Sequence, residues 1–319
     1  MELLYHPIYT RHDTGMHPEN KKRISIFEGL PETDPLNGTP FLQLVHPPEY
    51  IKHIKDICKN GTGLDGDTVV CQDSFDTAAY AVGATIQASE QGNFALVRPP
   101  GHHAYAQKGS GFCLFNNVAI ASQRLVTEGK RVLIFDFDGH LGDGTSDIFY
   151  ETDQVMYISL HQYPAFPGNG FIKEIGEGKG KGFNVNFPLP PGSADDIFLD
   201  AMEHATAIAK QFQPDVVALS AGFDAHQYDL LLDLKVTTSA YYKIGEMMKA
   251  SFDNVFATLE GGYNVQALRK SVLSFVAGFN GEAPYTELEE QTFSGMRVWE
   301  TYEMYLHGTL GQMQNYWKM

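Results

Sequence analysis

The chain of 319 residues has few cysteines, few basic residues and no long hydrophobic run. Its cysteines, Cys58, Cys71 and Cys113, are odd in number and widely spaced. They therefore predict neither a disulfide framework nor a paired-cysteine zinc motif, and they suit a reducing compartment. The first residues lack the basic and apolar regions of a secretory signal, and no apolar run reaches the roughly 20 residues of a membrane helix. We expect a cytoplasmic protein without a membrane segment.

Basic residues are outnumbered by acidic ones. The chain has 23 Lys and Arg against 39 Asp and Glu, which gives a formal net charge of −16. This balance argues against nucleic-acid binding, which needs basic groups to neutralise phosphates, and it is compatible with cationic substrates. The content of 43% hydrophobic and 12% aromatic residues is typical of a folded chain.

Short apolar runs alternate with helical patterns along the chain. Continuous runs such as VLIF and VVAL are typical of strands that are buried on both faces, so we expect an α/β fold with a mostly parallel, helix-flanked sheet. The expected strands are 94–98, 132–138, 155–161, 183–187, 216–222 and 255–260, and the expected helices are 77–89, 117–127, 193–212, 238–251 and 265–279.

No linker divides the chain, so we expect a single domain over residues 1–319. Within it, residues 281–319 differ in character, because they are rich in aromatic residues and methionine. We expect this C-terminal extension to be helical and to pack on the body of the protein or on a second subunit, which makes a homo-oligomer an expected partner.

Polar side chains follow five of the expected strands at the point where each strand ends. In an open α/β sheet, sites form outside the carboxyl ends of the strands. Chance would not place so many carboxylates and imidazoles there, and we therefore expect an active site. The residues at these ends are His102, His103, Asp136, Asp138, His140, Asp143, His161, Asp224, His226, Glu260 and Tyr263.

The types and spacing of these residues predict amide hydrolysis at a metal. Asp138 and His140 are two residues apart and point to the same side of an extended strand end, and Asp224 can complete a three-ligand site. Such a site keeps open positions, as catalytic metal sites do. His102 and His103 are suited to proton transfer near neutral pH, and the hydroxyl of Tyr263 is suited to stabilise an oxyanion.

Several segments also resemble one known family, the zinc-dependent histone deacetylase superfamily, which includes acetylpolyamine amidohydrolases. The resemblance runs from the HPEN segment at residues 17–20 to about residue 280. It is carried by RPPGHHA (98–104), GSGFCLFNN (109–117), DFDGHLGDGT (136–145), SLH (159–161), SAGFDAH (220–226) and LEGGYN (259–264).

The resemblance implies an arginase/deacetylase-type fold, a zinc-dependent deacetylase activity and a role for each matching residue. Asp138, His140 and Asp224 would hold Zn²⁺, and His103 would act as general base and then as general acid. The remaining assignments are His102 for electrostatic tuning, Asp136 and Asp143 as the carboxylates that orient His102 and His103, Tyr263 as the hydrogen-bond donor to the scissile carbonyl, Phe112 and Phe166 as walls of an acyl-lysine tunnel, Gly111 as a contact of the substrate amide, and Leu231 at the rim.

The resemblance further implies two structural K⁺ sites and an arginine, Arg23, near an internal channel. The first K⁺ site would use Asp136, Asp138 and Ser159 with the backbone carbonyls of His140 and Leu160. The second would use the carbonyls of Phe149, Thr152 and Val155.

Two positions depart from the family pattern. Leu141 stands where the family usually has a second histidine; that histidine is not a metal ligand, so the metal site is expected to persist. Asp229-Leu230-Leu231 replaces the usual Asp-Pro-Leu in the rim segment, which leaves the substrate preference open.

The expected reaction is hydrolysis of an N-acetyl amide on a lysine side chain or on an acetylated polyamine. Fe²⁺ is an alternative to Zn²⁺ for two carboxylates and one imidazole. Two other functions are weighed against this one: a binuclear manganese ureohydrolase, which would need a second ligand set, and a non-catalytic acyl-lysine binding protein, which would be expected to have lost a ligand, the base or the tyrosine.

Overall fold

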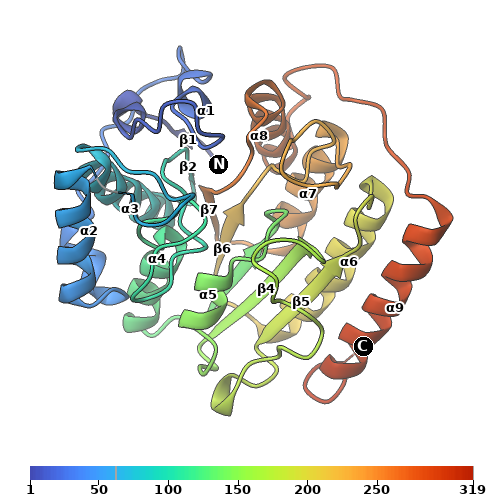
Figure 1. Ribbon diagram of the computed structural model, residues 1–319. Helices are drawn as coiled ribbons and strands as arrows, with labels where there is room; N and C mark the ends of the chain where they lie inside the picture. The colour runs from blue at the N-terminus through green and yellow to red at the C-terminus, as the bar shows by residue number, and fades with distance from the viewer. Residues whose placement is uncertain (62, 319) are drawn as a thin grey trace.

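A seven-stranded parallel sheet forms the centre of the computed structural model, which describes residues 1–61 and 63–318 (Figure 1). The strand order is β1-β2-β7-β6-β3-β4-β5. The helix-flanked parallel sheet expected from the sequence is therefore confirmed. The strands are β1 Leu3–Leu4, β2 Phe94–Ala95, β3 Val132–Asp136, β4 Val155–Gln162, β5 Asn184–Leu189, β6 Val216–Ala221 and β7 Val255–Leu259.

Helices cover both faces of this sheet (Figure 1). Helices α3 and α4 contact the strands from one side. Helix α6 contacts β4 and β5 and also packs against α7, which in turn packs against α8. The helices are α1 Lys22–Ser25, α2 Pro48–Asn60, α3 Ser74–Gln91, α4 Asn117–Thr127, α5 Asp143–Ile148, α6 Asp195–Phe212, α7 Thr238–Ser251, α8 Val265–Asn280 and α9 Met296–Met313. Among the described residues, no helix combines the length and hydrophobicity needed to cross a membrane.

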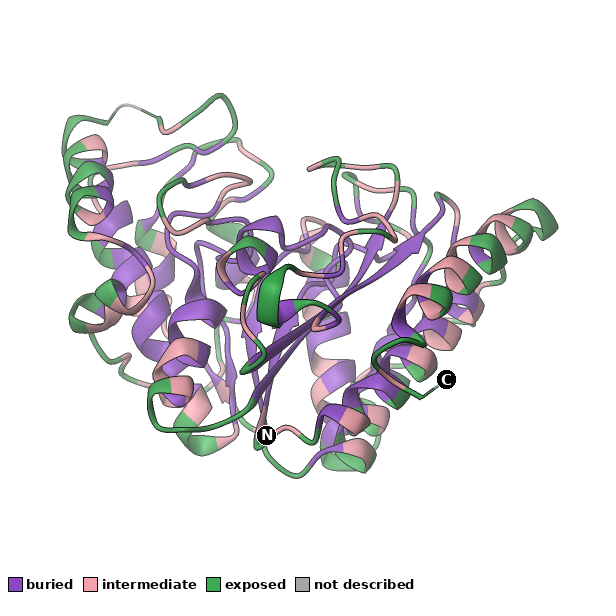
Figure 2. Ribbon diagram, turned by 90° about the horizontal axis from the view of Figure 1, so that it is seen from below, coloured by how far each residue is buried: buried purple, intermediate pink, exposed green. Residues whose placement is uncertain are grey.

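The sheet is buried, and the helices expose their outer faces to solvent (Figure 2). All five residues of β3 and all eight of β4 are buried. This explains why their sequences run without polar alternation, because each face of a parallel sheet packs against helices. Each buried Val, Leu, Ile or Phe side chain contributes about 1.5–3 kcal/mol to the hydrophobic free energy of folding.

Capping asparagines fix where helices α4 and α8 begin. Asn116 caps α4 by accepting a hydrogen bond from the Ala119 N–H at 3.0 Å. Asn264 caps α8 in the same way through Ala267 at 3.1 Å, as expected of Asn at this position. Because Asn264 follows Tyr263 directly, the start of α8 also fixes the place of that tyrosine at the edge of the sheet.

The C-terminal extension lies beside the edge strand β5 and helix α6 of the same chain (Figure 1). The Tyr302 hydroxyl donates to Asp200 Oδ2 of α6 at 2.6 Å, and Thr309 Oγ1 donates to the carbonyl of Asn186 in β5 at 2.8 Å. The helix α9 thus covers the exposed side of the last strand, which would otherwise be an open sheet edge.

The expected strand 94–98 is wrong in length, because only Phe94–Ala95 is paired as strand β2. It lies between β1 and β7, and the two prolines at 99 and 100, which have no N–H to donate, follow soon after. The glycine-rich stretch 176–182 lies between β4 and β5 and contains a short 3₁₀ turn, Gly178–Gly180.

Candidate active site

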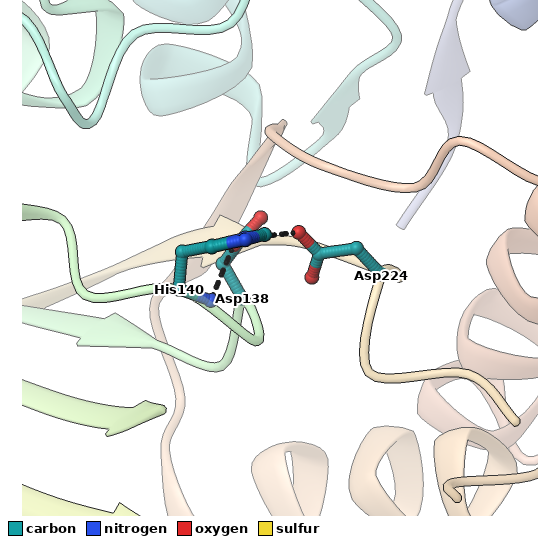
Figure 3. Close-up of side chains that lie close together, drawn as sticks. All are labelled: Asp138, His140 and Asp224. Carbon is teal, nitrogen blue, oxygen red and sulfur yellow. Dashed lines mark hydrogen bonds and ion pairs between the residues drawn. The ribbon is translucent and has the colours of Figure 1, made fainter. Parts of the chain in front are cut away.

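Three of the predicted site residues, Asp138, His140 and Asp224, form a buried cluster (Figure 3). Each offers one ligand atom, and these atoms lie within 4.8 Å of one another. Asp138 and His140 follow β3, and Asp224 follows β6, the neighbouring strand. His140 Nδ1 lies 2.7 Å from Asp224 Oδ2 and 3.4 Å from Asp138 Oδ1. Two adjacent parallel strands therefore bring the three side chains to one point.

The surroundings of this cluster fit a divalent metal. Burial and the neighbouring charge of Asp138 raise the pKa of Asp224 to about 7, as is typical of carboxylates that share a buried site without a cation. Glycines leave the space: a Cβ atom at Gly222 would lie 1.9 Å from Asp138 Oδ2, and one at Gly261 would lie 2.4 Å from Asp224 Oδ2. Two carboxylates and one imidazole in this cradle suit Zn²⁺ or Fe²⁺ with open positions.

His102 and His103 lie beside the cluster, each paired with its own carboxylate. His102 Nδ1 lies 3.1 Å from Asp136 Oδ2, and His103 Nδ1 lies 2.7 Å from Asp143 Oδ1. The two rings are 4.1 Å apart between centroids.

The two histidines differ in protonation. Burial acts to lower the pKa of His102, but the carboxylates of Asp138 and Asp136 outweigh it and raise the pKa well above its usual value. Burial and the positive charge of His102 instead lower the pKa of His103 to about 4. In the metal-free protein at neutral pH, a cationic imidazole thus lies beside a neutral one. A neutral imidazole can accept a proton, which is what a general base requires.

Tyr263 faces the same space and is held by three groups. Its N–H donates to Asp229 Oδ2 at 2.6 Å, the guanidinium of Arg23 lies 4.9 Å from its ring centroid, and the ring of Phe112 lies at 5.6 Å. Burial raises the pKa of Tyr263 well above its usual value and outweighs the influence of Arg23. The hydroxyl therefore stays protonated and is available as a donor.

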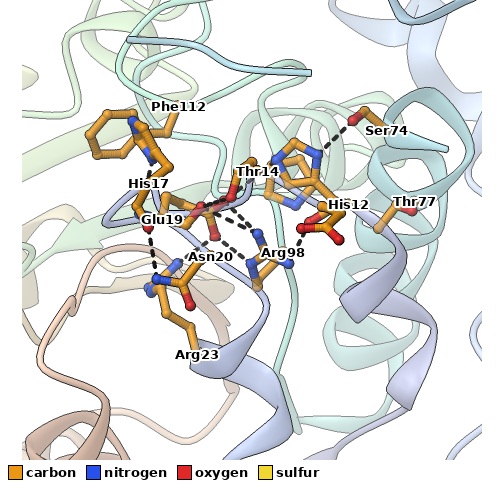
Figure 4. Close-up of polar contacts among 12 residues, drawn as sticks. His12, Thr14, His17, Glu19, Asn20, Arg23, Ser74, Thr77, Arg98 and Phe112 are labelled. Atoms are coloured by element: carbon orange, nitrogen blue, oxygen red, sulfur yellow. Dashed lines mark hydrogen bonds and ion pairs between the residues drawn. The ribbon is translucent and has the colours of Figure 1, made fainter. Parts of the chain in front are cut away.

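Buried ion pairs and hydrogen bonds hold the guanidinium of Arg23 in place (Figure 4). Glu19 accepts from Arg23 Nη1 at 3.1 Å and from Arg98 Nη2 at 2.8 Å, and Arg23 Nε donates to the carbonyl of Gly262 at 2.7 Å. Burial opposes the ionisation of Glu19, but Arg98 outweighs it and holds the pKa of Glu19 well below its usual value. The HPEN segment that contains Glu19 thus stabilises the wall of the site on the side of Tyr263.

A cavity of about 260 Å³ leads from the surface to these groups. Phe166 is 51% exposed at its mouth, and its ring lies 5.1 Å from that of His103. Gly111 has a φ of +53°, and a Cβ atom there would lie 2.4 Å from the His103 ring, so only glycine fits this position. The cavity is lined by Asp65, Asp67, His103, Ser110, Gly111, Phe112, His140, Phe166, Leu231 and Tyr263.

The residues for which the resemblance implies potassium lie on β3, on β4 and in the segments that adjoin these strands. Asp136 and Ser159 are register partners on β3 and β4, with Leu160 following on β4 and Asp138 and His140 on the adjacent loop. Phe149, Thr152 and Val155 lie along the connection from α5 to β4, where the Thr152 N–H donates to the Phe149 carbonyl at 3.3 Å.

Two histidines at the strand ends turn away from the cavity. His161 bonds Ser159 Oγ and the Gly170 carbonyl, both at 2.9 Å, and His226 Nε2 lies 2.9 Å from Glu289 Oε2. The strand-end pattern does not distinguish side chains that enter a site from those that support a neighbouring loop.

Some contributing residues were missed or left without a role by the sequence reasoning. Asp65 and Asp67 reach the cavity mouth from the loop before α3. Glu260 accepts from the N–H groups of Gly101 and His102 at 2.7 and 3.1 Å, and Tyr105 donates to Asp143 Oδ2 at 2.8 Å. A signal existed for Glu260 and Tyr105, because both lie inside or directly after quoted motifs, but none existed for the two aspartates.

The chain is similar to known deacetylases in sequence and in structure. The histone deacetylase domain matches residues 17–279. A probable deacetylase of Archaeoglobus fulgidus is 35% identical over 311 residues, which cover 88% of this chain and 86% of the relative. The HDA15 HD domain has a TM-score of 0.88 at 29% identity and covers 99% of this chain and 96% of its own. An acetylpolyamine aminohydrolase from Burkholderia pseudomallei has a TM-score of 0.80 at 28% identity, with 88% and 99% covered.

Proposed function

The chain belongs to the histone deacetylase family, and on that premise we propose that it hydrolyses the N-acetyl amide of a lysine side chain or of an acetylated polyamine. The products are acetate and the free amine. One observation carries this proposal: the buried cluster of Asp138, His140 and Asp224 meets, through His140, a cavity that is also lined by His103 and Tyr263.

Asp138, His140 and Asp224 are the ligands we propose for Zn²⁺. Bound there, the ion would polarise the scissile carbonyl and lower the pKa of a water molecule. His103 accepts the proton of the attacking water and later returns it to the departing amine nitrogen. The Tyr263 hydroxyl donates to the carbonyl oxygen as negative charge develops on it, a contribution that typically accelerates such reactions by about 10²–10³-fold. His102, whose ring lies 4.1 Å from that of His103, would tune the electrostatics of the site.

The cavity mouth favours a substrate that carries positive charge beyond its acyl group. Asp65 and Asp67 line the mouth and are exposed, and the whole chain carries a net charge of −16. An acetylated polyamine retains cationic amines beyond its acetyl group, and a lysine-rich peptide offers similar charges. An acetylpolyamine amidohydrolase of Burkholderia pseudomallei is 38% identical over 207 residues, which supports testing the polyamine first.

We propose K⁺ at the two sites formed by Asp136, Asp138, Ser159 and the carbonyls named above, where it would offset buried negative charge next to the ligands. The three cysteines are free thiols, which supports a cytoplasmic location. A homo-oligomer is proposed through the C-terminal extension, whose Met304 is 64% exposed.

The experiment measures amine release from an acetyl-lysine peptide and from an acetylated polyamine, side by side. Each substrate is tested with the zinc-loaded protein, after chelation, with the Tyr263→Phe variant and with Tyr228→Phe as control. Tyr228 is 57% exposed, and its hydroxyl makes no hydrogen bond to the described residues. We expect turnover that chelation abolishes, that Tyr263→Phe lowers by about 10²–10³-fold in kcat and that Tyr228→Phe preserves. Turnover that survives both chelation and Tyr263→Phe would contradict the proposed chemistry.

A further inference from the structure

The carboxylate of Asp143 is held at both of its oxygens. His103 Nδ1 lies 2.7 Å from Oδ1, and the Tyr105 hydroxyl donates to Oδ2 at 2.8 Å. Asp143 is 4% exposed, so bulk water does not replace either partner. Burial acts against ionisation, but the hydrogen bonds of His103 and Tyr105 outweigh it and lower the pKa of Asp143. Asp143 is thus an ionised acceptor with one donor assigned to each oxygen.

Backbone contacts fix the segment that carries His103 and Tyr105 against helix α5. The Thr145 N–H donates to the His102 carbonyl at 3.0 Å. A Cβ atom at Gly144 would lie 2.4 Å from the Ala104 carbonyl. The two backbones therefore touch, and the distance between Asp143 and the segment is set. What remains adjustable is the rotation of the Asp143 carboxylate, which only its hydrogen-bond partners can fix.

Tyr105 is placed to fix that rotation without touching a substrate. It does not line the cavity, and its N–H donates to the Lys108 carbonyl at 2.8 Å, which closes a tight turn. The Lys108 ammonium lies 5.6 Å from the Tyr105 ring centroid. Burial and the charge of Asp143 raise the pKa of Tyr105, so its hydroxyl remains a donor.

We propose that Tyr105 is a positioning residue for His103: its hydroxyl holds the Asp143 carboxylate in the plane that orients the imidazole, so that Nε2 faces the reacting atoms. This inference rests on the proposed function, in which His103 moves the proton. A hydrogen bond to a charged acceptor contributes more than one between neutral groups. Residues that directly orient the groups of a metal site typically cost about 10–100-fold in metal affinity or activity when they are lost. Tyr105 acts one contact further out, through Asp143, so we take the lower end of this range.

The test compares Tyr105→Phe with a matched control. Tyr302 also donates its hydroxyl to an aspartate, Asp200, at 2.6 Å, but it does so between α9 and α6. Tyr105→Phe and Tyr302→Phe each delete one oxygen and one tyrosine–aspartate hydrogen bond. We expect both variants to fold and to lose some thermal stability. We expect only Tyr105→Phe to lower kcat, by at least about tenfold, with KM unchanged because Tyr105 lies outside the cavity.

Two further readouts separate positioning from a structural role. Without the Tyr105 donor, the negative charge of Asp143 stabilises a protonated His103 more strongly and raises its pKa. We therefore expect the acid limb of the profile of kcat/KM against pH to move to higher pH. In the Asp143→Ala background, Tyr105→Phe should have no further effect on kcat, because Tyr105 acts on His103 only through the Asp143 carboxylate. An equal loss in both backgrounds, or a parent-like kcat in folded Tyr105→Phe, would overturn the inference.

A spectroscopic measurement keeps this test independent of activity. In protein labelled with ¹⁵N at histidine, the His103 Nδ1–H resonance reports its hydrogen bond to Asp143. We expect Tyr105→Phe to shift this resonance and Tyr302→Phe to leave it in place. If the parent hydrolyses no acetylated amine while the resonance shifts as expected, the proposed function fails and the positioning stands. An unchanged resonance in Tyr105→Phe overturns the positioning itself.

Discussion

A methyl group added at Gly222 should displace Asp138, one of the proposed metal ligands, directly. Gly222 follows β6, and a Cβ atom there would lie 1.9 Å from Asp138 Oδ2 and 2.4 Å from Asp138 Cγ. Its φ lies outside the left-handed region, so Gly222→Ala places no strain on the backbone, and the contact with Asp138 decides the outcome.

The size of the effect follows from these distances. Cβ atoms are essentially never found closer than 3.0 Å to another heavy atom, and the added atom would also lie 2.5 Å from Asp138 Cα. The Asp138 carboxylate must therefore move by about 1 Å, and its backbone must shift with it. Metal–ligand distances are held within about 0.2 Å. Loss of a group that merely supports a ligand weakens metal binding by about 10–100-fold, and moving the ligand itself should cost more. We therefore expect Gly222→Ala to bind zinc more than about 100-fold less tightly than the parent.

The assay is competition for zinc against a chromogenic chelator, with circular dichroism to verify folding. Gly311→Ala in α9 is the control, because a Cβ atom there meets no atom within 4 Å. Gly261→Ala is a second perturbation, since its Cβ atom would lie 2.4 Å from Asp224 Oδ2 and 2.6 Å from Asp138 Oδ2. A folded Gly222→Ala protein with the zinc affinity of the parent would refute the assignment of Asp138 as a ligand.

Three further predictions concern protons, thiols and charge at the cavity mouth. In the metal-free protein, burial and Asp138 raise the pKa of Asp224 to about 7, and the two carboxylates outweigh burial to raise that of His140 to about 10. Because ligands bind deprotonated, zinc binding should release protons and tighten as pH rises from about 6 to 8; calorimetry in buffers of different ionisation enthalpy measures this, and a pH-independent affinity would contradict it. Burial opposes the ionisation of Cys71, but hydrogen bonds from His12 and Ser74 lower its pKa to about 6, whereas burial raises that of Cys58 to about 12. Iodoacetamide should therefore label Cys71 first at neutral pH, and equal labelling of both thiols by mass spectrometry would disprove this order. Finally, Asp65→Asn and Asp67→Asn should each raise KM for an acetylated polyamine by about two- to fivefold at low salt and less at high salt, while a KM independent of both charges would show that they do not recognise the amine.

Much of the fold and of the buried cluster of Asp138, His140 and Asp224 could be predicted from the sequence, because both depend on local patterns. Continuous apolar runs identify β3 and β4 as strands buried on both faces, and Asp138 and His140 are separated by a fixed two-residue step. The meeting of Asp224 with these residues depends on β6 lying next to β3, an order that periodicity alone does not contain.

The supporting contacts could not be predicted, because they join segments that are far apart in the chain. Glu19 meets Arg98 across 79 positions, and Glu260 meets Gly101 across 159. Asp229 accepts from the Tyr263 N–H at 2.6 Å across a separation of 34 residues. In each case a carboxylate neutralises or binds groups whose burial is known only once the chain has folded, so residue type and spacing carry no signal for the pairing.

Leu141 shows why one departure from the family pattern is compatible with an intact cluster of Asp138, His140 and Asp224. It is 1% exposed and belongs to the hydrophobic core, although it follows His140 directly. A Cβ atom at Gly170 would lie 2.8 Å from Leu141 Cδ2 and 2.6 Å from His161 Nε2, so Leu141 packs against the loop that follows β4. Both ring nitrogens of His161 already have hydrogen-bond partners there, Ser159 Oγ and the Gly170 carbonyl. An imidazole at position 141 would need a polar partner in this packed region, whereas leucine needs none. Leucine at this position therefore acts on the packing of the loop that carries Phe166 and leaves the cluster of Asp138, His140 and Asp224 intact.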